Sequence, residues 1–383
     1  MPRQHSPLDP PARLLCGPGP SNPDASVLAA MQRPMLGHLD LDMHEVLHEV
    51  VELLRAAWRA SDEDLVLALS STGTSAMEAG IVNLVAPGET VIVGSCGFFG
   101  RRLTEIARRH GANVVEVQAD WGQSVPNEAL LAALDEHPEA RMMAVVHAET
   151  STGVEHPLEQ LGAALNARAT DILLMADCVT SLAGIELDFG RFRLDFAYSC
   201  TQKCLAGPPG MAPVALSPRA QARLSERTHR VPFSLDLALL RDYWVTRPAK
   251  YHHTAPILNI YALHEGLRGV AQEGLEARWR RHLAAGRYLQ HGLTSFGLEL
   301  LADPWRQLAP LTAVRVPDGV DRMTVQNAMR DEHGIEIGGS LGPDSPSIWR
   351  IGLMGPNATE ETAEIVLGAL EQVLVAQRPL VAA

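Results

Sequence analysis

The chain has 383 residues, of which 46% are hydrophobic and 20% are charged. This composition is typical of a globular protein with room for one large domain and a smaller one. The net charge of −13 argues against nucleic acid as the main partner, because phosphate contacts need clustered Lys and Arg side chains.

No window of the sequence approaches the ~20 apolar residues that a membrane helix needs, and the N-terminal residues lack the apolar stretch of a signal peptide. We therefore expect no membrane partner and a cytoplasmic location. The chain has five cysteines, an odd number, and no C-x-x-C pair. This pattern argues against a disulfide framework and a zinc site, so we expect no metal and a reducing compartment.

The first part of the chain, residues 1–16, is rich in proline and predicts an irregular arm. Further on, short apolar runs alternate with amphipathic stretches, which predicts an α/β domain with a mainly parallel, mixed sheet covered on both faces. The predicted strands are 65–70, 90–94, 113–117, 141–147, 171–176, 195–199 and 211–216. The predicted helices between them are 75–86, 99–110, 127–136 and 158–169.

The C-terminal part predicts a second, smaller α+β domain. Helical periodicity over residues 258–291 predicts one linking helix that leaves the large domain. Strand patterns follow at 296–301, 311–316 and 348–353, with helices near 322–333 and 359–376. We therefore expect a large domain over residues 17–272 and a small domain over residues 273–383.

A lysine and an acid suggest the chemistry of the large domain. Asp177 ends an apolar, strand-like run, and Lys203 follows in a turn flanked by Gly and Pro. This pair suits pyridoxal 5'-phosphate (PLP): the lysine amine can form a Schiff base with the cofactor aldehyde. The carboxylate can keep the pyridine nitrogen protonated, so that the ring withdraws electrons.

The run S-S-T-G-T-S-A-M-E-A (70–79) predicts a phosphate site. It follows a strand and opens a helix, where free N–H groups favour an anion. Gly73 permits close approach of the backbone, and Thr72 and Thr74 add hydroxyl groups. A plain Ser/Thr helix cap is the alternative. The run lacks the G-x-x-x-x-G-K pattern of a nucleotide-binding loop.

Three further positions are candidates for ligand contacts. Phe98 and Phe99 lie between two glycines, and one of them, Phe99 by register, can stack on a flat ring, although both can be core residues. Ser151 follows a strand, where open α/β sheets bind ligands, although it can equally cap a turn. Arg350 lies in a buried strand pattern and matches a carboxylate, whether that of a substrate or of a structural ion pair.

Together these segments resemble the fold-type I PLP-dependent enzymes of aminotransferase class V, and most closely the alanine–glyoxylate and serine–pyruvate aminotransferases. The resemblance runs over nearly the whole chain. It rests on G-P-G-P-S (17–21), G-H-L-D (37–40), T-G-T-S-A-M-E-A (72–79), E-T-S-T-G-V (149–154), Asp177, T-Q-K-C-L-A-G-P-P-G (201–210), Y-H-H-T-A-P (251–256) and R-I-G-L-M-G (350–355).

The resemblance implies a role for each matching residue. Lys203 and Asp177 are the catalytic pair, Val179 packs under the ring, and Phe99 stands where the family often has a stacking Trp. The other implied cofactor contacts are Thr72, Gly73, Thr74, Gln202 and Ser151 within one subunit, with Tyr251 and Thr254 reaching the phosphate of the neighbouring subunit. This arrangement requires a homodimer with shared active sites. Arg350 binds the substrate carboxylate, and Gly19 lets the backbone approach the substrate.

The predicted activity is transfer of an amino group from a small amino acid, alanine or serine, to a 2-oxo acid, glyoxylate or pyruvate, with ping-pong kinetics. Ureidoglycine–glyoxylate aminotransferase is a rival, although its members tend to have Gln at the position of His38. A cysteine desulfurase or other PLP lyase is disfavoured, because Gln202 rather than His precedes Lys203 and no cysteine follows Cys204. A binding protein on the same fold is expected to lose Lys203 or Asp177.

Overall fold

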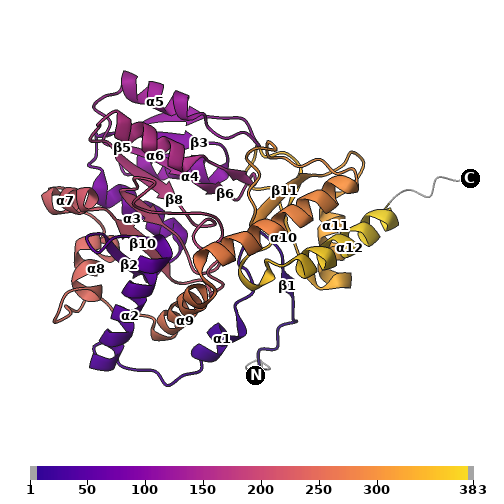
Figure 1. Cartoon of the computed structure of the whole chain (residues 1–383), viewed down its shortest axis with the longest axis horizontal. Coiled ribbons are helices and arrows are strands. Elements are labelled where there is room, and N and C mark those ends of the chain that lie inside the picture. The colour runs from indigo at the N-terminus through magenta and orange to yellow at the C-terminus, as the bar shows by residue number, and fades with distance from the viewer. Residues whose placement is uncertain (1–6, 378–383) are drawn as a thin grey trace, which may run out of the picture.

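The computed structural model describes residues 7–377 and has a large domain and a smaller C-terminal domain, which lies to the right in Figure 1. Residues 1–6 of the predicted arm and residues 378–383 of the predicted small domain lie outside the described residues. Within residues 7–377, no helix has both the length and the apolar character needed to cross a bilayer.

A seven-stranded mixed sheet forms the centre of the large domain in the described part of the chain. Its spatial order is β2-β10-β9-β8-β5-β3-β4, and only β10 runs against its neighbours. The strands are β2 (Leu65–Leu69), β3 (Thr90–Ser95), β4 (Asn113–Gln118), β5 (Met142–Val146), β8 (Leu173–Asp177), β9 (Phe196–Tyr198) and β10 (Ala212–Leu216). These bounds confirm the seven strands predicted for this domain, and all but β4 are buried throughout.

Helices cover the sheet, as Figure 1 shows. The four predicted helices are confirmed as α3 (Gly73–Leu84), α4 (Phe98–Arg109), α5 (Asn127–Glu136) and α6 (Leu158–Ala167). The prediction omitted α2 (Leu41–Trp58), which packs against β2. Its signals were present, because Asp40 caps its first turn and Met43, Leu47, Val50 and Leu54 form a buried stripe at helical spacing. Shorter helices are α1 (Ala25–Ala30), α7 (Pro218–Glu226) and α8 (Leu237–Trp244).

Two predictions between the domains were wrong. The single helix expected over 258–291 is two helices, α9 (Ile257–Glu273) and α10 (Leu275–Ser295), which meet at Gly274. Gly274 has a φ of 82°, a left-handed value that interrupts a helix and that glycine adopts at little cost. The strand expected over 296–301 is only one isolated bridge, between Leu300 and Val314. The domain boundary at 272/273 lies beside Gly274 and stays a prediction.

The small domain has its own core. Its three-stranded antiparallel sheet is β11 (Leu311–Arg315), β14 (Ile348–Gly352) and β13 (Gly338–Gly339), with α10, α11 (Arg322–His333) and α12 (Glu360–Gln377) packed around it. The core includes Trp349 of β14 and Leu289 of α10. The N-terminal segment also belongs here, because β1 (Leu14–Leu15) pairs with β12 (Ile335–Glu336) and Cys16 is buried in this core.

The sheet topology brings several loops to one edge. Because β2, β3, β5, β8 and β9 run in the same direction, the segments that follow their carboxyl ends lie side by side. These segments include residues 70–74, residues 96–99, and the hairpin of β6 (Ala148–Glu149) and β7 (Val154–Glu155). The β9–β10 connection, which carries Lys203, also starts at this edge.

Two helical glycines offer a matched test of the packing. A Cβ atom on Gly286 of α10 would overlap the backbone carbonyl of Ala309, whereas a Cβ atom on Gly368 of α12 would meet nothing within 4 Å. We expect Gly286→Ala to destabilise the protein by about 1–3 kcal/mol through overpacking. Gly368→Ala should stabilise it by about 0.5–1 kcal/mol by favouring the helix. Urea unfolding measures both, and equal effects would contradict the close contact at Gly286.

Candidate active site

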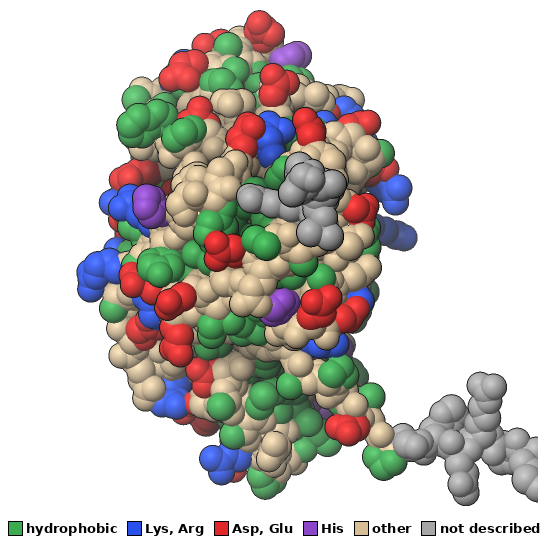
Figure 2. All heavy atoms as spheres, turned by 90° about the vertical axis from the view of Figure 1, so that its right-hand side faces the viewer, with side chains coloured by type: hydrophobic (Ala, Val, Ile, Leu, Met, Phe, Trp, Pro, Cys, Tyr) green, Lys and Arg blue, Asp and Glu red, His purple; other side chains and the backbone are tan. Residues whose placement is uncertain are grey.

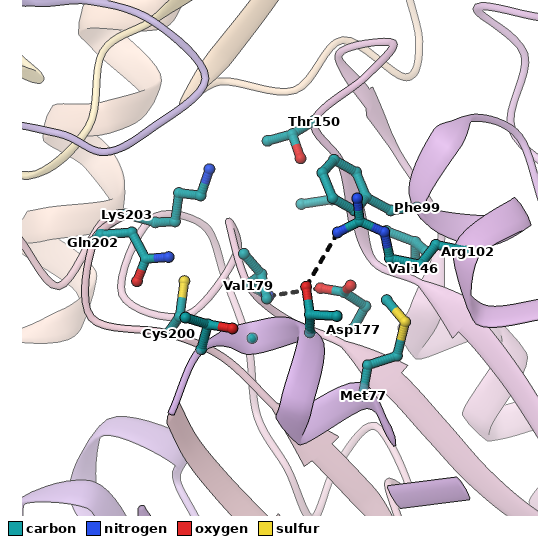
Figure 3. A pocket seen from close by; sticks show the side chains of 14 residues that line it. Met77, Phe99, Arg102, Val146, Thr150, Asp177, Val179, Cys200, Gln202 and Lys203 are labelled. Carbon is teal, nitrogen blue, oxygen red and sulfur yellow. Dashed lines mark hydrogen bonds between the residues drawn. The ribbon is translucent and has the colours of Figure 1, made fainter. Parts of the chain in front are cut away.

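A cavity of about 190 Å³ opens at the edge where these loops meet (Figure 3). Its lining includes eight of the residues singled out from the sequence: Thr72, Gly73, Thr74, Phe99, Asp177, Val179, Gln202 and Lys203. Met77, Arg102, Val146, Ala148, Thr150 and Cys200 complete it. Residues far apart in the chain therefore surround one small space.

Asp177 ends β8 and is 3% exposed. One carboxylate oxygen accepts a hydrogen bond from the N–H of Val179 at 2.9 Å, and the other accepts one from the hydroxyl of Tyr198 at 2.7 Å. Burial raises the pKa of Asp177 to about 6. Within residues 7–377 this carboxylate forms no ion pair, so a cationic group on a ligand would offset the cost of burying its charge.

Lys203 lies in the connection between β9 and β10, and its side chain enters the cavity (Figure 3). The amine contacts the carbonyl of Pro18, and the loop is fixed by the Ser21 hydroxyl, which donates to the Lys203 carbonyl at 2.9 Å. Burial lowers the pKa of Lys203. Gly19 lies against the same amine with a φ of 106°, and a Cβ atom there would overlap it. The segment 17–21 therefore forms one wall around the lysine.

The start of α3 offers an anion site at the same cavity. Thr72 is the N-cap residue but makes no side-chain cap hydrogen bond. Within the described residues, the N–H groups of Gly73 and Thr74 have no acceptor. A Cβ atom on Gly73 would come within 2.9 Å of Val179, so a side chain at this turn beside the cavity would force Val179 to move. The free N–H groups and the positive end of the helix dipole suit a phosphate.

A buried carboxylate holds the start of α4, the helix that carries Phe99. Glu149 accepts hydrogen bonds from the N–H groups of Gly100 at 3.1 Å and Phe99 at 3.4 Å. Ser151 was predicted to lie near the ring hydroxyl of the cofactor. Its hydroxyl accepts from the N–H of Phe98 at 2.8 Å and donates to Glu149 at 2.5 Å, and it is fully buried, so the contact with the ring hydroxyl stays a prediction. Its neighbour Thr150 lines the cavity, so Ser151 lies behind the wall.

Arg350 lies on β14 of the small domain and is 6% exposed. Its Nε donates to the carbonyl of Gly339 at 2.7 Å and its Nη1 to the carbonyl of Thr150 at 3.2 Å. Burial lowers the pKa of Arg350 to about 10, so the side chain stays charged at neutral pH. Arg350 forms no ion pair within residues 7–377, so the structural ion pair that the sequence also allowed is not present there. Its guanidinium is therefore available to the carboxylate of a ligand.

Tyr251 and Thr254 do not line the cavity of their own subunit. They lie between α8 and α9 on the surface, where Tyr251 is 61% exposed and its ring lies 5.5 Å from that of His38. Both residues are therefore available to a neighbouring molecule rather than to the site of this subunit.

Four residues in or next to the cavity wall were given no role in the sequence analysis. Tyr198 binds Asp177 because β8 and β9 pair in a register that places the two opposite each other. Glu149 and Thr150 lie inside a quoted motif without having been given a role, and Arg102 lies one turn after Phe99. The sequence did offer a signal for Tyr198, a polar residue at the end of the strand that follows the one carrying Asp177. No feature of the local sequence indicated a role for Arg102.

Comparison with known proteins agrees with this site. The profile described as aminotransferase class V matches residues 23–358. An alanine–glyoxylate aminotransferase from Callithrix jacchus is 36% identical over 372 residues, covering 96% of this chain and 89% of that protein. The crystal structure of alanine–glyoxylate aminotransferase from Nostoc sp. has a TM-score of 0.93 at 44% identity, covering 97% of this chain and 98% of that one.

A ureidoglycine–glyoxylate aminotransferase structure from Bacillus subtilis is also similar. Its TM-score is 0.93 at 34% identity, and the match covers 98% of this chain and 96% of that one. The chain belongs to the class V aminotransferases, which are PLP-dependent enzymes with the fold-type I architecture. Amino acids and oxo acids are the substrates of this class.

The unpaired carboxylate of Asp177 gives a stability prediction. In the cofactor-free protein its pKa is raised, so the native state binds the proton more tightly than the unfolded state and Asp177 destabilises the fold as pH rises from about 4 to 6. Asp177→Asn should therefore stabilise the cofactor-free protein at pH 7 by about 1–3 kcal/mol. The gain should be small at pH 4, close to the ordinary pKa of Asp, and vanish below it, where the aspartate is protonated in both states.

Asp195 provides the matched control, because it is also buried but lies within 3.6 Å of Arg193 and 3.5 Å of Arg219. Asp195→Asn should destabilise the protein at pH 7, because it leaves these arginines without their carboxylate. Urea unfolding at pH 4 and pH 7 measures both variants. A loss of stability in Asp177→Asn at pH 7 would show that its charge is compensated in the cofactor-free protein.

Proposed function

We propose that this protein is a PLP-dependent aminotransferase that transfers the amino group of alanine or serine to glyoxylate or pyruvate. The observation that carries the proposal is the placement of Asp177 and Lys203 in the walls of one cavity. The identity to alanine–glyoxylate aminotransferases over nearly the whole chain supports the choice of substrates.

The residues of the cavity fit the cofactor. Bound PLP supplies an electron-withdrawing ring that stabilises negative charge at the Cα atom of the amino acid. Asp177 is placed to pair with the ring nitrogen, and Tyr198 keeps the carboxylate in place. Phe99 and Val179 offer two apolar surfaces for the ring, with a smaller stack than a Trp would give. The start of α3 and Gln202 would hold the phosphate.

Lys203 would bind the cofactor and then move the proton. The amine of Lys203 would remove the proton from the substrate Cα as a general base and later return a proton as a general acid. The lowered pKa of Lys203 favours this role, because more of the amine is neutral near pH 7. The contact with the Pro18 carbonyl keeps the amine inside the cavity.

Arg350 would orient the substrate by binding its carboxylate with its planar guanidinium. The two backbone carbonyls that accept from Nε and Nη1 fix the plane of the group. Gly19 leaves room for the substrate beside Lys203. Because Arg350 is the carboxylate-binding side chain we assign to the substrate, we expect small neutral donors rather than dicarboxylic amino acids.

We also propose that the protein is a homodimer in which Tyr251 and Thr254 complete the phosphate site of the partner. Large apolar side chains are exposed in the segments that flank His38 and Tyr251: Met35 at 70% and Leu41 at 79% lie near His38 in sequence, and Phe233 at 65% stacks on His252. His38 connects these segments, because its ring lies 5.5 Å from Tyr251 and its carbonyl accepts from the hydroxyl of Tyr243 at 3.3 Å. Exposed apolar surface of this kind is typical of a subunit interface.

The first test is a panel of half-reactions with the purified PLP-loaded protein. We expect L-alanine or L-serine to bleach the visible absorption band of the bound cofactor and glyoxylate or pyruvate to restore it, with ping-pong kinetics for the pair. Ureidoglycine should be a poor donor. Lys203→Ala, the control, should lose the band and all turnover, because no other amine in the cavity replaces it. Preferred use of ureidoglycine would favour ureidoglycine–glyoxylate aminotransferase activity. Near-normal transamination by Lys203→Ala would show that Lys203 does not bind the cofactor aldehyde.

The second test addresses the shared sites. Two variants are compared: Lys203→Ala, and the double variant Tyr251→Phe with Thr254→Val. The homodimer of each variant should be nearly inactive at limiting PLP. Mixed dimers should regain one intact site, built from the lysine of one subunit and the hydroxyls of the other, so that an equal mixture recovers about a quarter of the wild-type activity. Turnover after unfolding and refolding the mixture together measures this. No recovery, or a monomeric mass in light scattering, would contradict the proposal.

A further inference from the structure

Arg102 lines the cofactor cavity, although no role has yet been given to it. It lies on α4, one turn after Phe99, and its Nη1 donates to the hydroxyl of Thr74 at 3.1 Å. Its guanidinium lies over the rings of Phe98 and Phe99, 4.8 Å and 5.1 Å from their centroids. In Figure 3 the side chains of Arg102 and Lys203 enter the cavity from opposite sides of the view.

Among the charged side chains that line the cavity, Arg102 is the one to which the proposed function assigns no contact. Arg102 and Lys203 are the cationic side chains in its lining, and Asp177 is the anionic one. In the proposed function, Lys203 binds the aldehyde of the cofactor and Asp177 pairs with its ring nitrogen. The phosphate of the cofactor carries close to two negative charges at neutral pH. Among the described residues that line this cavity, Arg102 is the cation that remains to balance them.

The other arginines of α4 have acidic partners. Arg101 lies 3.5 Å from Asp344, Arg108 lies 3.2 Å from Glu116, and Arg109 lies 2.7 Å from Glu105. Within residues 7–377, Arg102 forms no ion pair and has its hydroxyl contact with Thr74 instead. Thr74 stands at the start of α3, where the N–H groups of Gly73 and Thr74 have no acceptor in the described residues.

We propose that Arg102 binds the phosphate group of the cofactor together with the first N–H groups of α3. A guanidinium forms strong, charge-assisted hydrogen bonds to phosphate oxygens, and the two phenylalanine rings hold this one at the cavity wall. The proposal deepens the proposed function and rests on it, because the phosphate is that of PLP.

The test compares binding of PLP and of pyridoxal, which lacks the phosphate, to the full-length protein freed of cofactor. Arg102→Gln removes the charge at similar length, Arg102→Lys keeps the charge without the planar group, and Arg101→Gln is the matched control one residue away. Absorbance titration gives the Kd of each ligand. A second measurement asks whether inorganic phosphate competes with PLP for each protein.

We expect Arg102→Gln to raise the Kd of PLP about 10–100-fold, the loss of one hydrogen-bonded charge pair. Its Kd for pyridoxal should stay within about twofold of wild type, which also shows that the cavity is intact. Arg102→Lys should lie between the two, and Arg101→Gln should match wild type. Competition by inorganic phosphate should be weaker in Arg102→Gln.

Three results would overturn the proposal. An unchanged Kd for PLP in Arg102→Gln would show that Arg102 does not bind the phosphate, and a raised KM for the oxo acid alongside it would assign the guanidinium to a substrate carboxylate. An equal loss of PLP and pyridoxal binding would make Arg102 a support for Phe99 instead. Failure of the wild-type protein to bind PLP would refute the proposed function itself and would be seen before any variant is compared.

Discussion

The site depends on the burial of one carboxylate. Asp177 ends a fully buried strand, has two hydrogen-bond donors but no ion pair within residues 7–377, and its pKa is raised to about 6. A protein keeps such a group only at a cost to its own stability. That cost is offset when a positively charged ring nitrogen enters the cavity, so the strand end that destabilises the empty protein is what binds the cofactor in the proposed function.

The walls around this carboxylate are connected to each other. Glu149 holds the start of α4 and therefore the position of Phe99, while the carbonyl of the next residue, Thr150, accepts a hydrogen bond from Arg350 of the small domain. The segment 17–21 contacts the Lys203 loop on the other side. One hairpin thus contacts both the helix that carries Phe99 and Arg350 of the small domain, the arginine proposed to bind the substrate.

The sequence predicted the strands well where burial was complete, because a strand covered on both faces is a continuous apolar run whose ends are easy to see. The predictions were wrong where the backbone left the regular conformation that the residue pattern indicated. Gly274 divides the expected long helix because of its left-handed φ, and the run 296–301 has strand-like residues but only a single bridge to β11. Helix α2 was missed although its stripe was visible, because it precedes the first strand of the sheet and stands outside the strand–helix alternation.

By itself the sequence determined the chemistry of single residues: an amine in Lys203, an acid at a strand end in Asp177, a glycine turn at Gly73 and a guanidinium in Arg350. Only the tertiary structure decided which of these share a cavity and which serve them from behind. Ser151 accepts a hydrogen bond from the first N–H of α4, Tyr198 donates to Asp177, and Arg102 stands at the cavity wall without an ion pair in the described residues. The reason is physical: such contacts depend on strand register and on the packing of α3 against α4, which bring together residues that no local spacing relates.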